Sequence, residues 1–459
     1  MSITAEIPLL KATVSSGCNI LTDQYDGAFN EYMRRWSDID KKTPTAIVLP
    51  TSEQDIQITV QWAVKSSIPF VIKSGGPSEW STIGTNGIII DLSQYSAIQV
   101  NKEAGTVTLK GSVLSKEVAV RLADEGLCTA LGNGNTVGAV GYFLGGGASI
   151  VTSVLGYGSD QIVSARMVTA GGDLVNVTQE THPDLLWAIR GAGQYFGLIT
   201  ELTVECHPLL ALGNKRGVIW AGSFLFPLDR IREVCSVMKV IMDDSRHATA
   251  GLMMIMAPPP ARNPSLIIAA RYTGDPQDAP KAYRNLYELE PIVANGSEVP
   301  IQNTSDGREA IGAKGDFKRF GIVGLQDFNE DAFVQVADFW KEMVAECPDA
   351  INSAFNFQWD SRAPKTPKFD SAMSLHDTRY WQNNLIWHTD PKHRAKVDQY
   401  NERSIAIMRG PDETSYVDFQ NGTRAGPIKR RYRPAGKLAR LKKLKKEWDP
   451  EGVFTDHLL

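Results

Sequence analysis

Four glycine-dense segments contain the residues of this chain that are best suited to ligand chemistry. The first, IKSGGPSEWS at residues 72–81, follows a stretch typical of a β-strand and places Gly75 next to Gly76. Glycine allows the backbone to bend sharply, so that successive N–H groups face one way and bind a phosphate with no Cβ in the path. The segment is therefore a candidate phosphate-binding loop.

The other three segments have the same character. Residues 131–149 include seven glycines, and a close approach of backbone to a ligand would explain the entropic cost of ordering them. Residues 157–175 predict a loop and two strands, whereas residues 185–208 predict a helix that breaks at Gly191 and a strand from Leu198. A single glycine is most often a turn residue, but four such segments in this order favour one ligand site.

Composition and charge are those of an ordinary globular protein. The chain has 459 residues, which suits two domains, and a net charge of −4, which does not favour nucleic acid as a partner. No apolar run is long enough for a membrane span, and the N-terminus has no signal-peptide pattern, so we expect a cytoplasmic protein. Five scattered cysteines predict reduced thiols and no metal site.

Three regions differ in their sequence patterns. Residues 44–208 alternate short β-branched runs with helical patterns, which indicates an α/β or α+β unit. Residues 209–424 contain candidate strands with wide aromatic side chains, and predict a second domain with an antiparallel sheet flanked by helices. Residues 425–459 are basic and predict one helix with an apolar leucine stripe and a solvated cationic face.

The order of the glycine segments resembles the flavin domain of the berberine-bridge-enzyme-like, or vanillyl-alcohol-oxidase, family. The family pattern begins with I-x-S-G-G-H-S, continues through a glycine-rich loop and a Y-G pair followed by an aspartate, and ends with L-x-W-A-x-R-G. The resemblance covers about the first 208 residues and, through a closing helix and D-P-x-x-x-F turn, the last 40. The matching residues are Ile72, Ser74, Gly75, Gly76, Ser78, Gly132, Val137, Gly138, Gly141, Gly145, Gly147, Tyr157, Gly158, Asp160, Ile162, Trp187, Arg190, Gly191, Gly193, Phe196, Gly197 and Thr200.

This resemblance implies an α+β fold, FAD as the cofactor, and oxidoreductase activity. A two-part PCMH-type FAD-binding domain would occupy residues 1–208, with its core at 44–208, and a substrate-binding domain residues 209–424. Segment 425–459 would return to the FAD domain. The resemblance places the following residues at the cofactor, with Ile162 and Ile199 at its adenine end: Ser74, Gly75, Gly76, Pro77, Ser78, Gly132, Asn133, Thr136, Gly138, Gly141, Gly145, Gly146, Ile162, Gly197 and Ile199.

The chain departs from the family where the flavin is usually attached covalently. The family histidine after Gly-Gly is replaced by Pro77, which has no nucleophilic nitrogen within a chain. The cysteine that some members use for a second bond is replaced by Gly134. We therefore expect non-covalent FAD.

Candidate catalytic residues lie in the second domain. Tyr416 and Asp418 alternate in SYVDF, so on a strand they would share one face and one pocket. His376 stands where the family has an arginine, and its imidazole titrates near neutrality. Each of the three has a purely structural alternative. Trp359, Trp381 and Trp387 would form an aromatic wall for the substrate or pack in the core.

The resemblance implies proton abstraction by a protein base and hydride transfer to flavin N5, with O₂ as a candidate acceptor. The substrate would be a small organic molecule, in keeping with secondary metabolism. Two alternatives stay open. One is a non-redox FAD-containing isomerase or cyclase, and the other is a binding protein with vestigial flavin loops.

Overall fold

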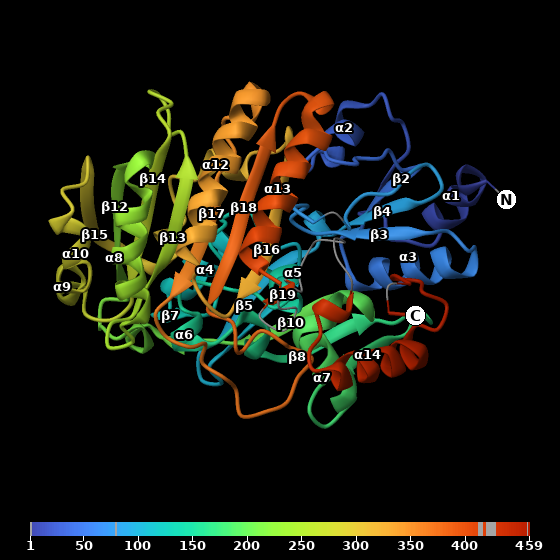
Figure 1. Ribbon diagram of the computed structural model, residues 1–459. Coiled ribbons are helices and arrows are strands. Elements are labelled where there is room, and N and C mark those ends of the chain that lie inside the picture. The colour runs from blue at the N-terminus through green and yellow to red at the C-terminus, as the bar shows by residue number, and fades with distance from the viewer. Residues whose placement is uncertain (1, 79, 412–415, 419–427, 457) are drawn as a thin grey trace.

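An eight-stranded antiparallel sheet faces two smaller sheets across the glycine-dense segments (Figure 1). The computed structural model describes residues 2–78, 80–411, 416–418, 428–456 and 458–459, and within 416–418 only the backbone is described. The mixture of layers confirms the predicted α+β fold with an antiparallel sheet in the second half of the chain.

The first small sheet leads directly into the first glycine segment. Three of its strands are parallel and one is antiparallel, and their near-continuous apolar runs are typical of strands covered on both faces. Lys73 at the end of its third strand forms a buried ion pair of 2.8 Å with Asp91 on the next strand, which fixes the start of the loop. The strands, in sheet order, are β1 (Asn19–Leu21), β2 (Ala46–Leu49), β4 (Ile88–Asp91) and β3 (Phe70–Lys73). Helices α1 (Ile3–Lys11), α2 (Gly27–Met33) and α3 (Glu53–Lys65) accompany them.

The second small sheet carries the third and fourth segments. It is antiparallel throughout, and helix α7 (Pro183–Ala192) breaks as predicted at Gly191, whose φ of 115° is in the left-handed region. The strands, in sheet order, are β5 (Ser96–Asn101), β6 (Thr106–Gly111), β10 (Leu198–Glu205), β8 (Ile162–Val168) and β9 (Leu174–Val177). The neighbouring helices and the short pair of strands are α4 (Ser115–Ala123), α5 (Ala139–Leu144), α6 (Thr152–Leu155), β7 (Leu127–Cys128) and β11 (His207–Pro208).

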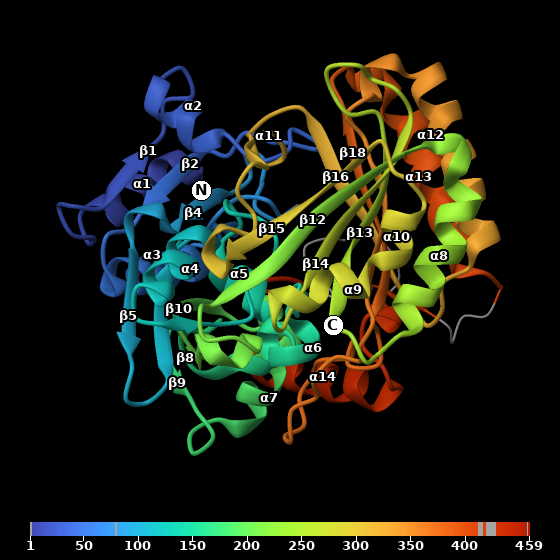
Figure 2. The same cartoon turned by 90° about the vertical axis from the view of Figure 1, so that its left-hand side faces the viewer.

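The large sheet has two different faces. Helices α8 (Ile231–Asp243), α12 (Glu330–Glu346) and α13 (Arg394–Arg409) cover one face and bury an apolar core with it (Figure 2). The other face turns toward the glycine segments. The strands, in sheet order, are β15 (Val293–Pro300), β12 (Val218–Pro227), β14 (Ser265–Tyr272), β13 (Thr249–Met256), β17 (Phe355–Asp360), β18 (Tyr380–His388), β16 (Phe317–Leu325) and β19 (Tyr416–Asp418). Three short helices complete this part, namely α9 (Ala279–Ala282), α10 (Arg284–Glu288) and α11 (Glu309–Gly312).

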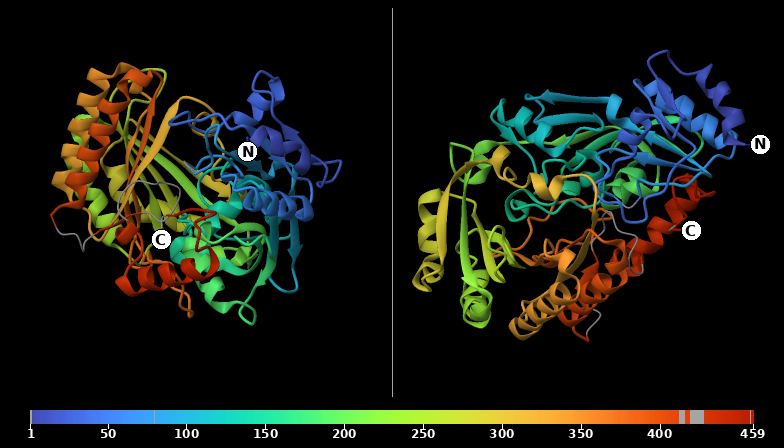
Figure 3. Two further views of the ribbon diagram at one scale, coloured as in Figure 1. Left: turned by 90° about the vertical axis from the view of Figure 1, so that its right-hand side faces the viewer. Right: turned by 90° about the horizontal axis from the view of Figure 1, so that it is seen from above.

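The basic C-terminal helix α14 (Ala435–Trp448) packs against α7, and Figure 3 shows it on the side of the molecule where the chain begins. Leu441 and Leu444 are buried, as the leucine stripe predicts. Lys445 differs from the expected solvated face, because it is buried beside Asp449 and donates to the Tyr195 carbonyl at 2.7 Å. Within the described part of the chain, every helix is too short or too polar to cross a membrane.

Candidate flavin and substrate site

The first and second glycine segments touch through their backbones alone. A Cβ on Gly75 would lie 2.5 Å from the backbone nitrogen of Gly138, and a Cβ on Gly138 would lie 2.8 Å from that of Gly75. Real Cβ atoms do not approach other atoms this closely, so both positions require glycine. Gly76 has a φ of 77°, which turns the chain in the way that the sequence predicted for this loop.

The second and third segments are joined by hydrogen bonds. The Gly158 N–H donates to the Gly147 carbonyl and the Ser159 N–H to the Gly146 carbonyl, both at 2.8 Å. The φ values of 112° and 76° at Gly146 and Gly147 make this crossing possible.

The fourth segment completes a circuit of contacts. Arg190 Nε donates to the Ile162 carbonyl at 2.9 Å, which joins the fourth segment to the third. The rings of Trp80 and Tyr195 meet edge to face with centroids 5.8 Å apart, which joins the fourth segment to the first. The four segments are therefore assembled around one region of the molecule, although more than a hundred residues separate the first from the last.

The first loop has the groups that a diphosphate requires. Ser74 Oγ is buried and has no hydrogen-bond partner among the described residues. An unmet hydroxyl next to backbone N–H groups of a glycine bend is a fitting donor set for phosphate oxygens. The residues present therefore fit the diphosphate of FAD.

The remaining predicted cofactor residues lie in two groups. The Thr136 carbonyl lies beside the contact between Gly75 and Gly138. The other members of the first group are Asn133 in the lining of a nearby cavity, Gly132 under the Tyr142 ring, and Gly141 and Gly145 in and after α5. The second group, Ile162, Gly197 and Ile199, lies in the second small sheet. The Ile162 carbonyl already accepts from Arg190 and its N–H donates to Ser159, so this backbone has partners inside the protein. Their place at the adenine end stays a prediction.

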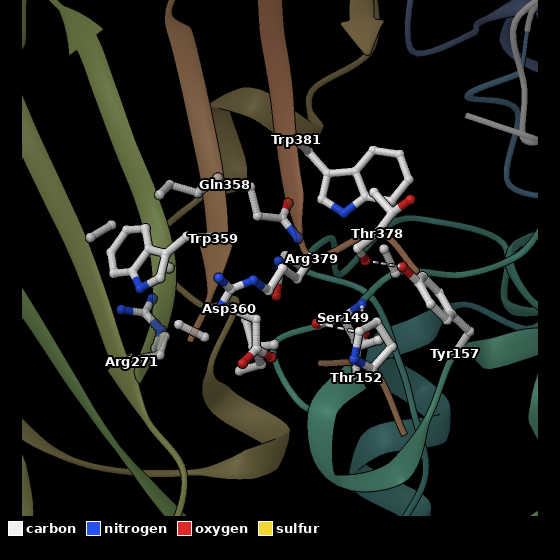
Figure 4. A pocket seen from close by; sticks show the side chains of 18 of the residues that line it. Ser149, Thr152, Tyr157, Arg271, Gln358, Trp359, Asp360, Thr378, Arg379 and Trp381 are labelled. Atoms are coloured by element: carbon white, nitrogen blue, oxygen red, sulfur yellow. Dashed lines mark hydrogen bonds between the residues drawn. The ribbon is translucent and has the colours of Figure 1, made fainter. Parts of the chain in front are cut away.

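A cavity separates the glycine segments from the large sheet. It contains about 520 Å³ of space, part of it open to solvent. Figure 4 shows Ser149, Thr152 and Tyr157 on one side, and Arg271, Gln358 and Asp360 from the sheet on the other.

Asp360 is the acidic residue of this cavity whose titration is most perturbed. Burial raises the pKa of its carboxyl to about 6, against hydrogen bonds from the Arg362 N–H and from Ser153 that lower the pKa. The Arg362 hydrogen bond measures 2.9 Å. A carboxyl with this pKa exchanges protons near neutrality, which suits a general base. The sequence offered no sign of it beyond an acidic residue at the end of a candidate strand.

The structure pairs His376 with a carboxylate of the third segment. Its Nε2 lies 2.9 Å from Asp160 Oδ1, and its ring meets that of Tyr157 with centroids 5.9 Å apart. His376 is absent from the cavity lining. This geometry favours an anchor between the two halves of the chain over acid–base catalysis.

Tyr416 and Asp418 form β19 at the edge of the large sheet, where Asp418 pairs with Val323 and Tyr416 with Leu325 of β16. Their side chains lie outside the described part of the structure, so their catalytic roles stay predictions. Among the tryptophans, Trp359 and Trp381 line the cavity. Trp387 does not, and its indole N–H donates to Asp316 at 2.8 Å.

Comparison with known proteins agrees with this geometry. Residues 44–178 match a family described as the FAD binding domain. The FAD-linked oxidoreductase hasG of Aspergillus fumigatus is 26% identical over 473 residues, covering 95% of this chain and 96% of that protein. The FAD-linked oxidoreductase afoF of Emericella nidulans is 27% identical over 445 residues, covering 94% and 90%.

Solved structures share the whole fold. The wild-type BBE-like 1 protein of Physcomitrella patens superposes with a TM-score of 0.83 at 16% identity, covering 99% of this chain and 98% of that one. The xylooligosaccharide oxidase of Myceliophthora thermophila gives 0.81 at 18% identity, with the same coverage. Over nearly its whole length the chain is therefore similar in sequence to FAD-linked oxidoreductases and shares the fold of BBE-like proteins, which confirms the resemblance found in its sequence.

The backbone contact between the loops predicts the effect of one methyl group. Gly75→Ala would force Gly75 and Gly138 apart, so purified protein should carry at most about a tenth of the FAD of the wild type, a loss that corresponds to about 1.4 kcal/mol or more of overpacking. Absorbance at 450 nm relative to 280 nm measures the loading. Gly436→Ala makes the same change in open space on α14 and should leave the loading unchanged. Full loading of Gly75→Ala would contradict the role of this contact.

The raised pKa of Asp360 predicts that replacing this carboxyl stabilises the folded protein by an amount that depends on pH. The folded protein keeps the Asp360 proton up to about pH 6, whereas the unfolded chain loses it near pH 3.8, so ionisation destabilises the fold as pH rises between these values. Asp360→Asn should raise the free energy of unfolding at pH 8 by about 1–2 kcal/mol, with a smaller gain at pH 5, as measured by urea denaturation.

Asp349→Asn is a control variant whose stability should change in the opposite direction. Hydrogen bonds from Thr389, Asp390 and His393 hold the pKa of Asp349 below its usual value, so this carboxylate stabilises the fold at neutral pH. Its replacement should lower stability at pH 8. A loss of stability in Asp360→Asn at pH 8 would contradict the assignment of Asp360.

Proposed function

We propose that this protein is an FAD-dependent oxidase or dehydrogenase that oxidises a small organic molecule, of the secondary-metabolite kind, with its flavin bound non-covalently. The observation that carries the proposal is the cavity between the circuit of glycine segments and the polar face of the large sheet. In it a titrating carboxyl, Asp360, lies opposite residues of the second and third glycine segments.

Residues at the first two loops would hold the cofactor through peptide N–H groups and the Ser74 hydroxyl. When bound, FAD supplies a hydride acceptor, and the protein supplies orientation and proton transfer. Backbone donors bind diphosphate without loss of side-chain entropy.

Non-covalent attachment is supported by the absence of a nucleophile where the family places one. Pro77 and Gly134 occupy those two positions. All five cysteines are buried and unpaired, and burial raises the pKa of Cys128 to about 12, so its reactive thiolate is scarce at neutral pH. Two described histidines contact the third segment, and both are held there: His376 by Asp160 and His207 by Gln161.

Asp360 is the base that the described residues favour. It accepts the proton of the substrate's oxidised group, and the raised pKa makes this transfer efficient near neutral pH. The Arg362 N–H fixes the carboxyl in place. Tyr416 and Asp418 are the alternative bases, and the experiment below separates the three.

Anaerobic mixing of the yellow protein with a panel of small alcohols, phenols and hydroxy acids tests the proposal. At least one compound should bleach the 450 nm band. For that compound the rate of bleaching should fall below about pH 6 and should drop about 100-fold or more in Asp360→Asn. Asp349→Asn should keep the wild-type rate.

The other outcomes are equally informative. An unchanged rate in Asp360→Asn together with a large loss in Tyr416→Phe or Asp418→Asn would move the base to β19. Product formation with neither bleaching nor O₂ consumption would replace the oxidoreductase reaction by isomerase or cyclase chemistry.

A further inference from the structure

Two arginines in the cavity have no anionic partner among the residues that the structure describes. Arg271 on β14 and Arg308 before α11 both line the cavity. Arg271 Nη1 donates only to the carbonyl of its own neighbour, Ala270, at 2.8 Å. Within the described ranges of the chain, no carboxylate lies within ion-pair distance of either guanidinium. By contrast, Arg216 and Arg319 each pair with a carboxylate, and Arg379 of the same cavity donates to the Ser361 carbonyl.

The register of the sheet explains why the strands next to Arg271 offer it no anionic partner. Its direct neighbours on β12 and β13 are Ala221 and Ala250, and directly opposite residues of paired strands share a face. Two methyl side chains therefore flank the arginine, and they leave room above the sheet. Beyond Ala250 the same row continues to Asp360 on β17.

This arrangement is costly in the free protein. Burial and the neighbouring charge of Arg308 lower the pKa of Arg271 to about 10, and burial also lowers the pKa of Arg308. Two like charges in a partly desolvated cavity repel each other and lose hydration. An anion that enters the cavity would offset both costs.

We infer that the cavity binds a small organic carboxylate, whose oxygens are held by Arg271 and Arg308. Planar guanidinium groups match carboxylate oxygens and form strong charge-assisted hydrogen bonds. The inference rests on the proposed function, since it names the substrate class of the same site.

The strand register also sets the spacing between Arg271 and the proposed base, Asp360. Arg271 and Asp360 are separated by one strand, or roughly 10 Å across the sheet. This spacing separates the anchored carboxylate from the base. The substrate class is therefore a compact carboxylic acid that is oxidised at the end away from its carboxylate.

Isothermal titration of the FAD-loaded protein with benzoate, and with its neutral analogue benzamide, tests this inference. Benzoate should bind at least about tenfold more tightly than benzamide, because only benzoate brings the negative charge that the arginines lack. Heat of binding does not depend on redox turnover, so this test can succeed or fail independently of the proposed oxidation.

Single variants then assign the binding to the two arginines. Arg271→Met and Arg308→Met should each weaken benzoate binding about 30-fold or more, whereas benzamide should be affected little. Arg271→Lys keeps the charge and should weaken benzoate less than Arg271→Met. Arg284→Met removes an exposed arginine that pairs with Glu288 on α10 and should bind benzoate as the wild type does.

Melting temperature and flavin content separate the remaining explanations. Removing one of two repelling cations should leave the melting temperature of each Met variant equal to or above that of the wild type, with full FAD loading. Equal binding of benzoate and benzamide, or unchanged benzoate binding in both Met variants, would overturn the inference. Loss of FAD from either variant would also overturn it, by assigning the arginines to the flavin.

Discussion

The contact between the backbones of Gly75 and Gly138 is the constraint on which the rest of the structure depends. The two loops meet so closely that no Cβ fits at either position. Their N–H groups and the unpartnered Ser74 hydroxyl are therefore gathered at one place, backed by the buried Lys73–Asp91 ion pair. The hydrogen bonds of Gly146 and Gly147 and the Trp80–Tyr195 contact extend this arrangement to all four segments.

The large sheet and the glycine segments enclose a cavity, which is the proposed site for a second molecule. One face of the sheet packs against α8, α12 and α13, and the apolar surface buried there stabilises the fold. The opposite face is free to carry groups that the fold alone does not favour, such as the Asp360 carboxyl and the Arg271 guanidinium. Functional sites often sacrifice stability in this way.

Local patterns in the sequence were sufficient for the parts of the fold that depend on local chemistry. The glycine bends, the break at Gly191 and the strands β12, β13, β14 and β17 follow from such patterns. Strands β15 and β16 were not predicted. Strand β15 exposes most of its residues and shows no apolar alternation. Strand β16 contains polar and glycine residues between its apolar ones, a mixture that is typical of loops.

The cavity was harder to predict, because its residues meet only through tertiary register. Ala250 and Arg271 come from consecutive strands, but Asp360 comes from a strand much later in the sequence and Arg308 from a connection. For His376, the sequence suggested a catalytic role that the folded structure does not favour. Its chemistry suggested catalysis, but its neighbour Asp160 could be identified only from the folded chain.

The central claim is that backbone donors of the glycine loops hold FAD without a covalent bond, and acid precipitation of the purified yellow protein tests it most directly. The account predicts that the flavin is released into the supernatant and that it has the absorbance of free FAD. Yellow colour that stays with the precipitated protein would contradict the account, as would protein that takes up no FAD at all.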